Sequence, residues 1–187
     1  MLTAGVARAL HVWEDPNAWS TGFTTYKIPA DKPVFAGDEL SLDLSGSYIA
    51  PQRGLQHVFE TNIRHTGKWG GNVGLNYFPD QYIGIGGNIN MSDNGGAFVD
   101  QALGNLIVRF PICPIALAPY VFGGGGRSFD NLVEFEPKWQ WFADFGVGLE
   151  FRPSPVMGIF SDAAYMWHLD DGGVDRLLIR VGLRLLF

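Results

Sequence analysis

The chain has 187 residues, of which 47% are hydrophobic, 14% are aromatic and only 17% are charged. Soluble domains usually carry about 25% charged residues, and the length suits one domain. The formal net charge of −6 argues against a nucleic-acid-binding protein, and the single cysteine, Cys113, excludes a disulfide within the chain.

Residues 1–36 show no sustained hydrophobic period, although they include the aromatic side chains of Trp13, Trp19, Phe23 and Tyr26. Such side chains are costly to leave in water. We therefore expect an N-terminal arm, either loosely ordered or docked on a partner or on the domain that follows. The first residues lack the basic and apolar regions of an intact signal peptide. No run of apolar residues is long enough for a transmembrane helix.

From residue 37 onward, bulky apolar side chains alternate with small or polar ones in eight segments. A period of two residues indicates a β-strand with two chemically different faces. Between residues 39 and 49, for example, leucines share one face while serines and Asp43 share the other. The predicted strands cover residues 39–49, 68–78, 82–90, 103–110, 115–124, 138–152, 156–167 and 176–187.

The connections between these segments differ in length. Three are short and turn-like, with the sequences "PDQ", "PICP" and "PSP". Four are longer and rich in Gly, Asp and Asn, around residues 50–66, 91–101, 125–138 and 168–175. This order predicts an all-β fold, an eight-stranded up-and-down antiparallel barrel with both termini beside the short turns. Pro119, inside a predicted strand, favours a bulge or a local break in the ladder there.

The residue composition of the two strand faces indicates which face meets lipid. The polar face has many glycines and too few Lys and Glu residues for a solvent surface, so it suits the cramped interior of a small barrel. The continuous apolar face ends in aromatic residues, as in a transmembrane barrel with two aromatic girdles. The girdle residues at the short-turn end are Tyr77, Phe110, Phe151 and Phe187, and those at the other end are Tyr48, Trp69, Trp139, Trp141, Tyr165 and Trp167. A soluble lipocalin-like barrel would not need this arrangement.

Eight charged side chains are predicted to point into the lumen. They are Asp43, Asp144, Glu150, Asp162, Arg109, Arg152, Arg180 and Arg184. Because an unpaired charge in a confined space is costly, we expect these residues to form ion pairs. The pairs would act as a salt-bridged plug or as the gate of a narrow pore.

Other chemistry is weakly supported by the sequence. The run "GGGGRS" at residues 123–128 lacks the Lys-Ser/Thr ending of a phosphate-binding loop. None of the four histidines has metal-ligand spacing, so we expect no metal and no cofactor. His168 precedes "LDD", which leaves open a hydrolase based on a His–Asp pair. No nucleophile–base pair is visible in the sequence, so we expect a protein that is not an enzyme.

The terminal "RVGLRLLF" resembles the C-terminal assembly signal of bacterial outer-membrane proteins. The motifs "LNYF", "VRFP", "APYVFGGGG" and "GVGLEFRPSPVMGIFSDAAY" resemble the small OmpA-like outer-membrane β-barrel families, over about residues 37–187. The resemblance implies a bacterial outer-membrane location, periplasmic termini, and insertion by the barrel assembly machinery. The implied assembly-signal residues are Phe187, Leu185, Leu183, Val181 and Ile179.

The resemblance favours a non-catalytic role for the barrel. We expect a structural anchor or an interaction platform that uses its external loops or its N-terminal arm to bind a protein partner, with outer-membrane lipid around it and no nucleic acid. Two alternatives remain open, a narrow pore and a lipid-modifying or proteolytic enzyme.

Overall fold

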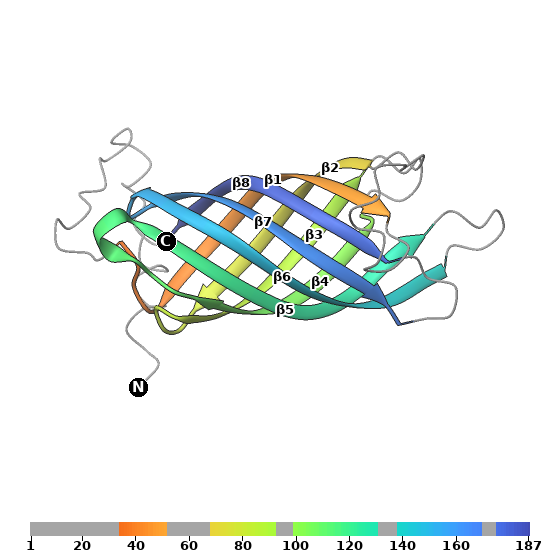
Figure 1. Cartoon of the computed structure of the whole chain (residues 1–187), viewed down its shortest axis with the longest axis horizontal. Helices are drawn as coiled ribbons and strands as arrows, with labels where there is room; N and C mark the ends of the chain where they lie inside the picture. The colour runs from red at the N-terminus through yellow and green to blue at the C-terminus, as the bar shows by residue number, and fades with distance from the viewer. Residues whose placement is uncertain (1–33, 52–67, 93–98, 131–137, 170–174) are drawn as a thin grey trace, which may run out of the picture. The chain divides into compact units, whose positions relative to one another are not determined.

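Eight strands form one closed barrel in a computed structural model, which describes residues 34–51, 68–92, 99–130, 138–169 and 175–187. Neighbouring strands are antiparallel and follow one another in chain order around the barrel (Figure 1). The strands are β1 (Glu39–Pro51), β2 (Lys68–Phe78), β3 (Ile83–Ser92), β4 (Gln101–Arg109), β5 (Leu117–Asp130), β6 (Lys138–Ser154), β7 (Met157–His168) and β8 (Arg176–Leu186). A short 3-10 helix, η2 (Cys113–Ile115), precedes β5. This arrangement confirms the predicted all-β, eight-stranded up-and-down fold.

The barrel closes because β1 pairs with β8 as well as with β2. A path through paired residues that leaves β1 at Leu40 returns to β1 at Ala50, ten residues farther along. With a rise of ~3.3 Å per residue and ~4.8 Å between strands, this stagger corresponds to a tilt of about 40°. The strands are visibly slanted to the long axis in Figure 1.

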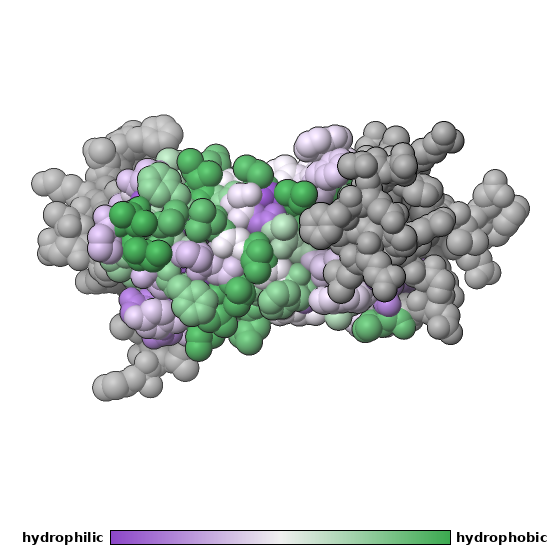
Figure 2. All heavy atoms as spheres, viewed as in Figure 1, coloured by the Kyte–Doolittle hydropathy of each residue, from purple (hydrophilic) through white to green (hydrophobic). Residues whose placement is uncertain are grey.

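The alternation of side chains sorts them between the interior and the outer surface. In β4, for example, Gln101, Leu103 and Asn105 are buried while the residues between them are exposed. Exposed leucine, isoleucine, valine and phenylalanine side chains cover the outer surface. Figure 2 shows many of them as hydrophobic patches on the visible face of the barrel. Such a surface requires an apolar surrounding, because a soluble protein rarely exposes so large a continuous apolar area.

The predicted girdle residues lie at the two ends of this apolar surface. Tyr48 on β1 and Trp69 on β2 are register partners, and their ring centroids are 4.9 Å apart. The ring centroids of Tyr165 and Trp167, both on β7, are also 4.9 Å apart. Trp69, Trp141, Phe110, Phe151 and Phe187 are exposed, and Tyr77 is half-buried. The side chain of Trp139 lies outside the described residues.

The C-terminal strand presents the residues of the predicted assembly signal on its outer face. Ile179, Val181, Leu183 and Phe187 are exposed, and Leu185 is half-buried. The backbone N–H of Phe187 donates a hydrogen bond to the Leu40 carbonyl (2.9 Å), which ties the last residue to β1. The role of these residues in assembly stays a prediction.

The bulge expected at Pro119 is absent. Pairing of β5 with β6 runs without a shift through Pro119, which faces Leu149. The carbonyl of Pro119 still accepts a hydrogen bond from the Phe110 N–H (2.8 Å), just past the end of β4. The ladder therefore tolerates the missing N–H because β4 ends there. The register shift lies instead between Phe151 and Ser154 of β6.

No helix among the described residues is long and apolar enough to cross a membrane. The arm predicted for residues 1–36 is described only from residue 34 onward. Residues 34–36 contact the barrel interior, so the barrel unit begins a few residues before the predicted boundary at residue 37.

We predict that Val147→Arg, midway along β6 on the outer face, lowers the free energy of unfolding in lipid vesicles by about 2–4 kcal/mol. An arginine at mid-depth on a lipid-facing strand carries a cost of that order, whereas near an interface the cost is ~1 kcal/mol or less. Phe110→Arg, at the end of the surface, is the matched control. Denaturant titration of tryptophan fluorescence gives both values. Equal, small costs would contradict a lipid-facing surface.

Candidate functional site

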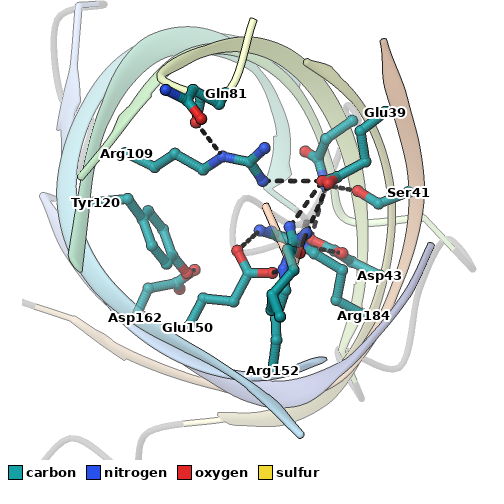
Figure 3. A network of polar contacts seen from close by, with 12 residues as sticks. Glu39, Ser41, Asp43, Gln81, Arg109, Tyr120, Glu150, Arg152, Asp162 and Arg184 are labelled. Atoms are coloured by element: carbon teal, nitrogen blue, oxygen red, sulfur yellow. Dashed lines mark hydrogen bonds and ion pairs between the residues drawn. The ribbon is translucent and has the colours of Figure 1, made fainter. Parts of the chain in front are cut away.

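We call the end of the barrel beside the short turns its inner end, and the end beside the long connections its outer end. The inner end of the lumen contains a connected set of ion pairs around Glu39. Arg109 donates a hydrogen bond from Nη1 to Glu39 Oε1 (2.8 Å). Arg152 donates from both terminal nitrogens to the same carboxylate (2.6 and 2.7 Å). Glu39 on β1 therefore connects β4 and β6, neither of which is its neighbour in the barrel. The convergence of these side chains is visible in Figure 3.

A second part of the set contains Arg184 of β8. Its Nε and Nη2 each donate to one oxygen of Asp43 (both 2.7 Å), in a two-pronged geometry, and its Nη1 donates to Glu150 (2.6 Å). The other oxygen of Glu150 accepts a hydrogen bond from Arg152 Nε. We call the six residues the lumen ion-pair network; they are Glu39, Asp43, Glu150, Arg109, Arg152 and Arg184.

The network balances three carboxylates with three guanidinium groups, and all six side chains are buried. Two-pronged arginine–carboxylate contacts are among the strongest ion pairs in proteins. Removing one partner from such a buried set leaves a charge without its counterion, which is more costly than losing the contact alone.

A separate pair, Arg180 and Asp162, lies farther along the lumen. Arg180 donates from Nε and Nη2 to the two oxygens of Asp162 (2.8 and 3.0 Å). The hydroxyl of Tyr120 donates a third hydrogen bond to this carboxylate (2.7 Å). Both charges and the phenol are buried, so this pair is also fully enclosed by the barrel.

Aromatic rings cover the flat faces of the arginines. The guanidinium carbon of Arg109 is 3.9 Å from the centroid of the Phe78 ring, and that of Arg152 is 4.3 Å from the Phe35 centroid. Arg184 contacts Phe160 in the same way at 5.2 Å. Such stacking satisfies the faces of the guanidinium groups without water, while the edges bind carboxylates.

The segment just before β1 closes the inner end of the lumen. Arg152 donates to the Val34 carbonyl (2.8 Å) and Arg109 donates to the Ala36 carbonyl (3.0 Å). Between them, the Phe35 side chain is 1% exposed. Arg109 also donates to the Gln81 carbonyl in the turn between β2 and β3 (2.6 Å). Arginines of the network thus hold both this segment and a short turn.

Asp144 departs from the predicted pairing. It points into the lumen and is 5% exposed, but neither carboxylate oxygen has a hydrogen-bond partner among the described residues. Its register partners are Gly124 and Met166, which offer no positive charge. No ion pair of Asp144 is found among the described residues, because Arg180, whose charge acts on this carboxylate, donates its hydrogen bonds to Asp162.

Other polar atoms near the long-connection end of the lumen share this condition. The amide groups of Asn72, Gln101 and Asn105 each contain at least one buried atom without a hydrogen-bond partner among the described residues. Buried polar groups of this kind are usually satisfied by ordered water. The two halves of the lumen therefore differ in how completely the described protein atoms satisfy their buried polar groups.

A serine–histidine contact lies at the outer end of the lumen. Ser128 Oγ on β5 is 3.3 Å from His168 Nε2 on β7. The backbone N–H of His168 donates to the Asp175 carboxylate (3.2 Å), and Phe142 lies against the imidazole ring. The spacing of these two residues in the sequence gives no sign of this contact. The two residues are 40 positions apart and meet because both point into the lumen from strands on either side of β6.

Glu39 and Phe35 contribute to the lumen site but are not among the lumen residues predicted from the sequence. Glu39 has the same parity as Ser41 and Asp43, so extending the first strand's inward face by two residues would have found it. Phe35 lies outside any strand, and no local pattern indicates its position.

Among the described residues, no group of three or more His, Cys, Asp or Glu side chains is arranged to hold a metal ion. The acidic residues Asp93, Asp170 and Asp171 lie outside the described residues.

The barrel is similar to solved structures of bacterial outer-membrane proteins. It matches the N-terminal β-barrel domain of Pseudomonas aeruginosa OprF with a TM-score of 0.57 and 13% identity, covering 81% of this chain and 99% of that one. It matches Neisserial surface protein A with a TM-score of 0.54 and 11% identity, covering 81% and 98%.

A third similar structure is the outer membrane protein OprG of Pseudomonas aeruginosa, with a TM-score of 0.51 and 9% identity, covering 81% of this chain and 97% of that one. No family model and no curated protein matches the sequence. At these identities the similarity establishes the fold alone, which is that of a closed eight-stranded β-barrel.

We predict opposite outcomes for two buried acids. Glu150→Ala should lower the free energy of unfolding by roughly 3–5 kcal/mol, because Arg152 and Arg184 then lose a counterion. Asp144→Asn should change it by less than ~1 kcal/mol or raise it, because the substitution breaks no ion pair and removes a buried charge. Denaturant unfolding in vesicles measures both, with Asp93→Ala as a control outside the strands. A large loss for Asp144→Asn would show that this residue has an essential partner.

Proposed function

We propose that this protein is a non-catalytic bacterial outer-membrane barrel that acts as a structural anchor or an interaction platform. The observation that carries the proposal is the filled inner half of the lumen. Phe35, Phe78 and the lumen ion-pair network are buried there, and the charges of the network are paired with one another. An eight-stranded barrel has an interior just wide enough for side chains to fill. A rigid, filled barrel suits a support for segments that project from the membrane.

The proposal includes an orientation and a route of assembly. Both termini, and the short turns beside them, would face the periplasm, and the longer connections would face outward. Phe187 and the apolar residues that alternate before it would be recognised by the barrel assembly machinery. A protein partner would then bind the external connections or the N-terminal residues 1–33.

We predict no steady single-channel conductance for the protein in planar lipid bilayers. The charge-balanced network and the stacked phenylalanines occupy the inner half of the lumen, so we expect no continuous path for hydrated ions there. A general porin reconstituted in the same way is the positive control. Heat-modifiable migration in gels would show that the tested protein is folded. Steady conductance from the folded protein would favour the narrow pore instead.

An enzymatic function is the second candidate, and the Ser128–His168 contact is the observation that favours it. Serine nucleophiles are activated by a histidine at this kind of distance. However, the Ser128 side chain is 0% exposed, and a nucleophile must reach the carbonyl carbon of a substrate. The contact therefore fits a structural hydrogen bond at the end of the lumen better than it fits a catalytic pair.

We predict that the folded protein is not labelled by a fluorophosphonate probe and does not hydrolyse ester lipids in vesicles. Ser128→Ala should then match the wild type in both assays, since its hydroxyl is not accessible. Labelling or hydrolysis that disappears in both Ser128→Ala and His168→Ala, with heat-modifiable migration preserved, would contradict the non-catalytic proposal.

A further inference from the structure

A groove lies on the outer face of three neighbouring strands, β1, β2 and β3. Its volume is about 220 Å³, and the residues that line it include Leu40, Leu75, Tyr77, Ile85 and Gly87. Tyr77 is the register partner of both Leu40 and Ile85, and Leu75 is the register partner of Gly87. Gly87 adds no side chain to this part of the surface, which leaves the hollow beside Leu75 and Ile85.

The lining of the groove suits a hydrocarbon chain. The side chains of Leu40, Leu75 and Ile85 are apolar and exposed, and the volume far exceeds the space that one water molecule needs. In a membrane, close packing decides which neighbour occupies a hollow, because lipid tails are as apolar as the side chains around them. A segment of an acyl chain that fills the groove gains these packing contacts.

The groove lies in the half of the apolar surface next to the inner end. Tyr77 belongs to the aromatic girdle at that end, and Leu75 is the next outward residue of β2. Trp69, in the other girdle, lies at the opposite end of the same strand face. Because aromatic girdles mark the depth of lipid headgroups, the groove leads from headgroup depth at Tyr77 to acyl-chain depth at Leu75 and Gly87.

A carboxylate stands at the headgroup end of the groove. The Tyr77 hydroxyl donates a hydrogen bond to Asp38 Oδ1 (3.0 Å), and this contact is exposed. The tyrosine therefore holds the Asp38 carboxylate beside the groove that it also lines. A carboxylate has about four lone-pair sites, so one phenol leaves it able to accept hydrogen bonds from another donor.

A second acid adjoins the first. Asp80, in the turn between β2 and β3, is exposed, and its Oδ1 accepts a hydrogen bond from the Tyr82 N–H (2.9 Å). This turn packs against Gly37, where an added Cβ would lie 3.0 Å from the Pro79 carbonyl oxygen and 3.5 Å from the Asp80 Cα. Since Gly37 directly precedes Asp38, both acids lie at the same end of the groove. They favour a cation there and disfavour an anion.

We propose that the groove and Asp38 bind a phospholipid with a primary ammonium headgroup, of the phosphatidylethanolamine type, in the leaflet next to the inner end. One acyl chain occupies the groove, and the ammonium donates charge-assisted hydrogen bonds to Asp38. A quaternary ammonium has no N–H to donate, and an anionic headgroup is repelled by Asp38 and Asp80. The inference rests on the proposed position of the barrel in a membrane, and it adds a surface that selects its lipid neighbour.

The test is a lipid titration of the folded full chain in detergent, followed by native mass spectrometry. The probes are phosphatidylethanolamine, phosphatidylcholine and phosphatidylglycerol with identical acyl chains. We expect phosphatidylethanolamine to bind about tenfold more tightly than phosphatidylcholine, as one charge-assisted contact supports, and phosphatidylglycerol to bind most weakly. Asp38→Asn should abolish the preference for phosphatidylethanolamine over phosphatidylcholine. Tyr77→Phe should reduce it, because Asp38 then loses the hydroxyl that holds it.

Asp175→Asn is the matched control for the headgroup contact. Asp175 accepts a hydrogen bond from the hydroxyl of another girdle tyrosine, Tyr165 (2.9 Å), but at the outer end of the barrel. Its substitution removes the same charge away from the groove and should leave the lipid preference unchanged. A preference lost equally in Asp38→Asn and Asp175→Asn would contradict a site at Asp38.

Gly87→Leu tests the groove itself. An added Cβ at Gly87 would meet the Leu103 carbonyl oxygen at 3.9 Å, which is an ordinary contact, so a side chain fits there and fills the hollow. The variant should lower the affinity for all three lipids severalfold. Gly71→Leu is its matched control, because Gly71 is on the outer face of β2 near Trp69 and an added Cβ would also meet a carbonyl oxygen at 3.9 Å. It should leave the affinities unchanged.

Three results would overturn the proposal. They are equal affinities of the wild type for phosphatidylethanolamine and phosphatidylcholine, a preference that survives Asp38→Asn, and an unchanged affinity in Gly87→Leu. Free ethanolamine should not displace the lipid, and displacement would overturn a site that requires an acyl chain. Heat-modifiable insertion of every variant into phosphatidylcholine vesicles tests the membrane position separately. A wild type that fails to insert would contradict that position, whereas an inserted protein without lipid preference contradicts this inference alone.

Discussion

The carboxylate of Glu39, held between Arg109 and Arg152, is the contact on which the interior of the barrel depends. Backbone pairing joins each strand only to its two neighbours, so it does not by itself fix the distance between opposite walls. Glu39 joins β1 to β4 and β6, and Arg184 connects β8 to both β1 and β6. The network therefore braces the barrel across its lumen, where a larger barrel would contain water.

The same arginines connect the barrel to the segment that precedes it. Because Arg109 and Arg152 bind the backbone on either side of Phe35, the chain enters β1 across the inner end of the lumen. The guanidinium groups of Arg109 and Arg152 thus donate hydrogen bonds to backbone carbonyls as well as to carboxylates, and the Phe35 ring packs against them. Charge balance, closure of the lumen and the position of the chain's entry are consequences of one set of contacts.

The outer half of the barrel follows a different principle. Its lumen contains amide side chains and Asp144 with incomplete hydrogen bonding among the described residues, and on its outer surface Arg127 stacks on Trp141. The proposed anchor or platform would draw its rigidity from the filled inner half.

The sequence by itself determined the strands, their inward and outward faces and the membrane-type barrel, because a period of two residues is a local property that each strand displays. It also placed Asp43, Glu150 and Arg184 inside. Which charges meet was decided only by the tertiary structure, since Glu39 and Arg152 are 113 residues apart and their contact depends on the stagger of the closed barrel. The same stagger leaves Asp144 beside Gly124 and Met166, brings Ser128 to His168, and sets Arg127 over Trp141. No local pattern contains that stagger, because it is a property of the whole ring of strands.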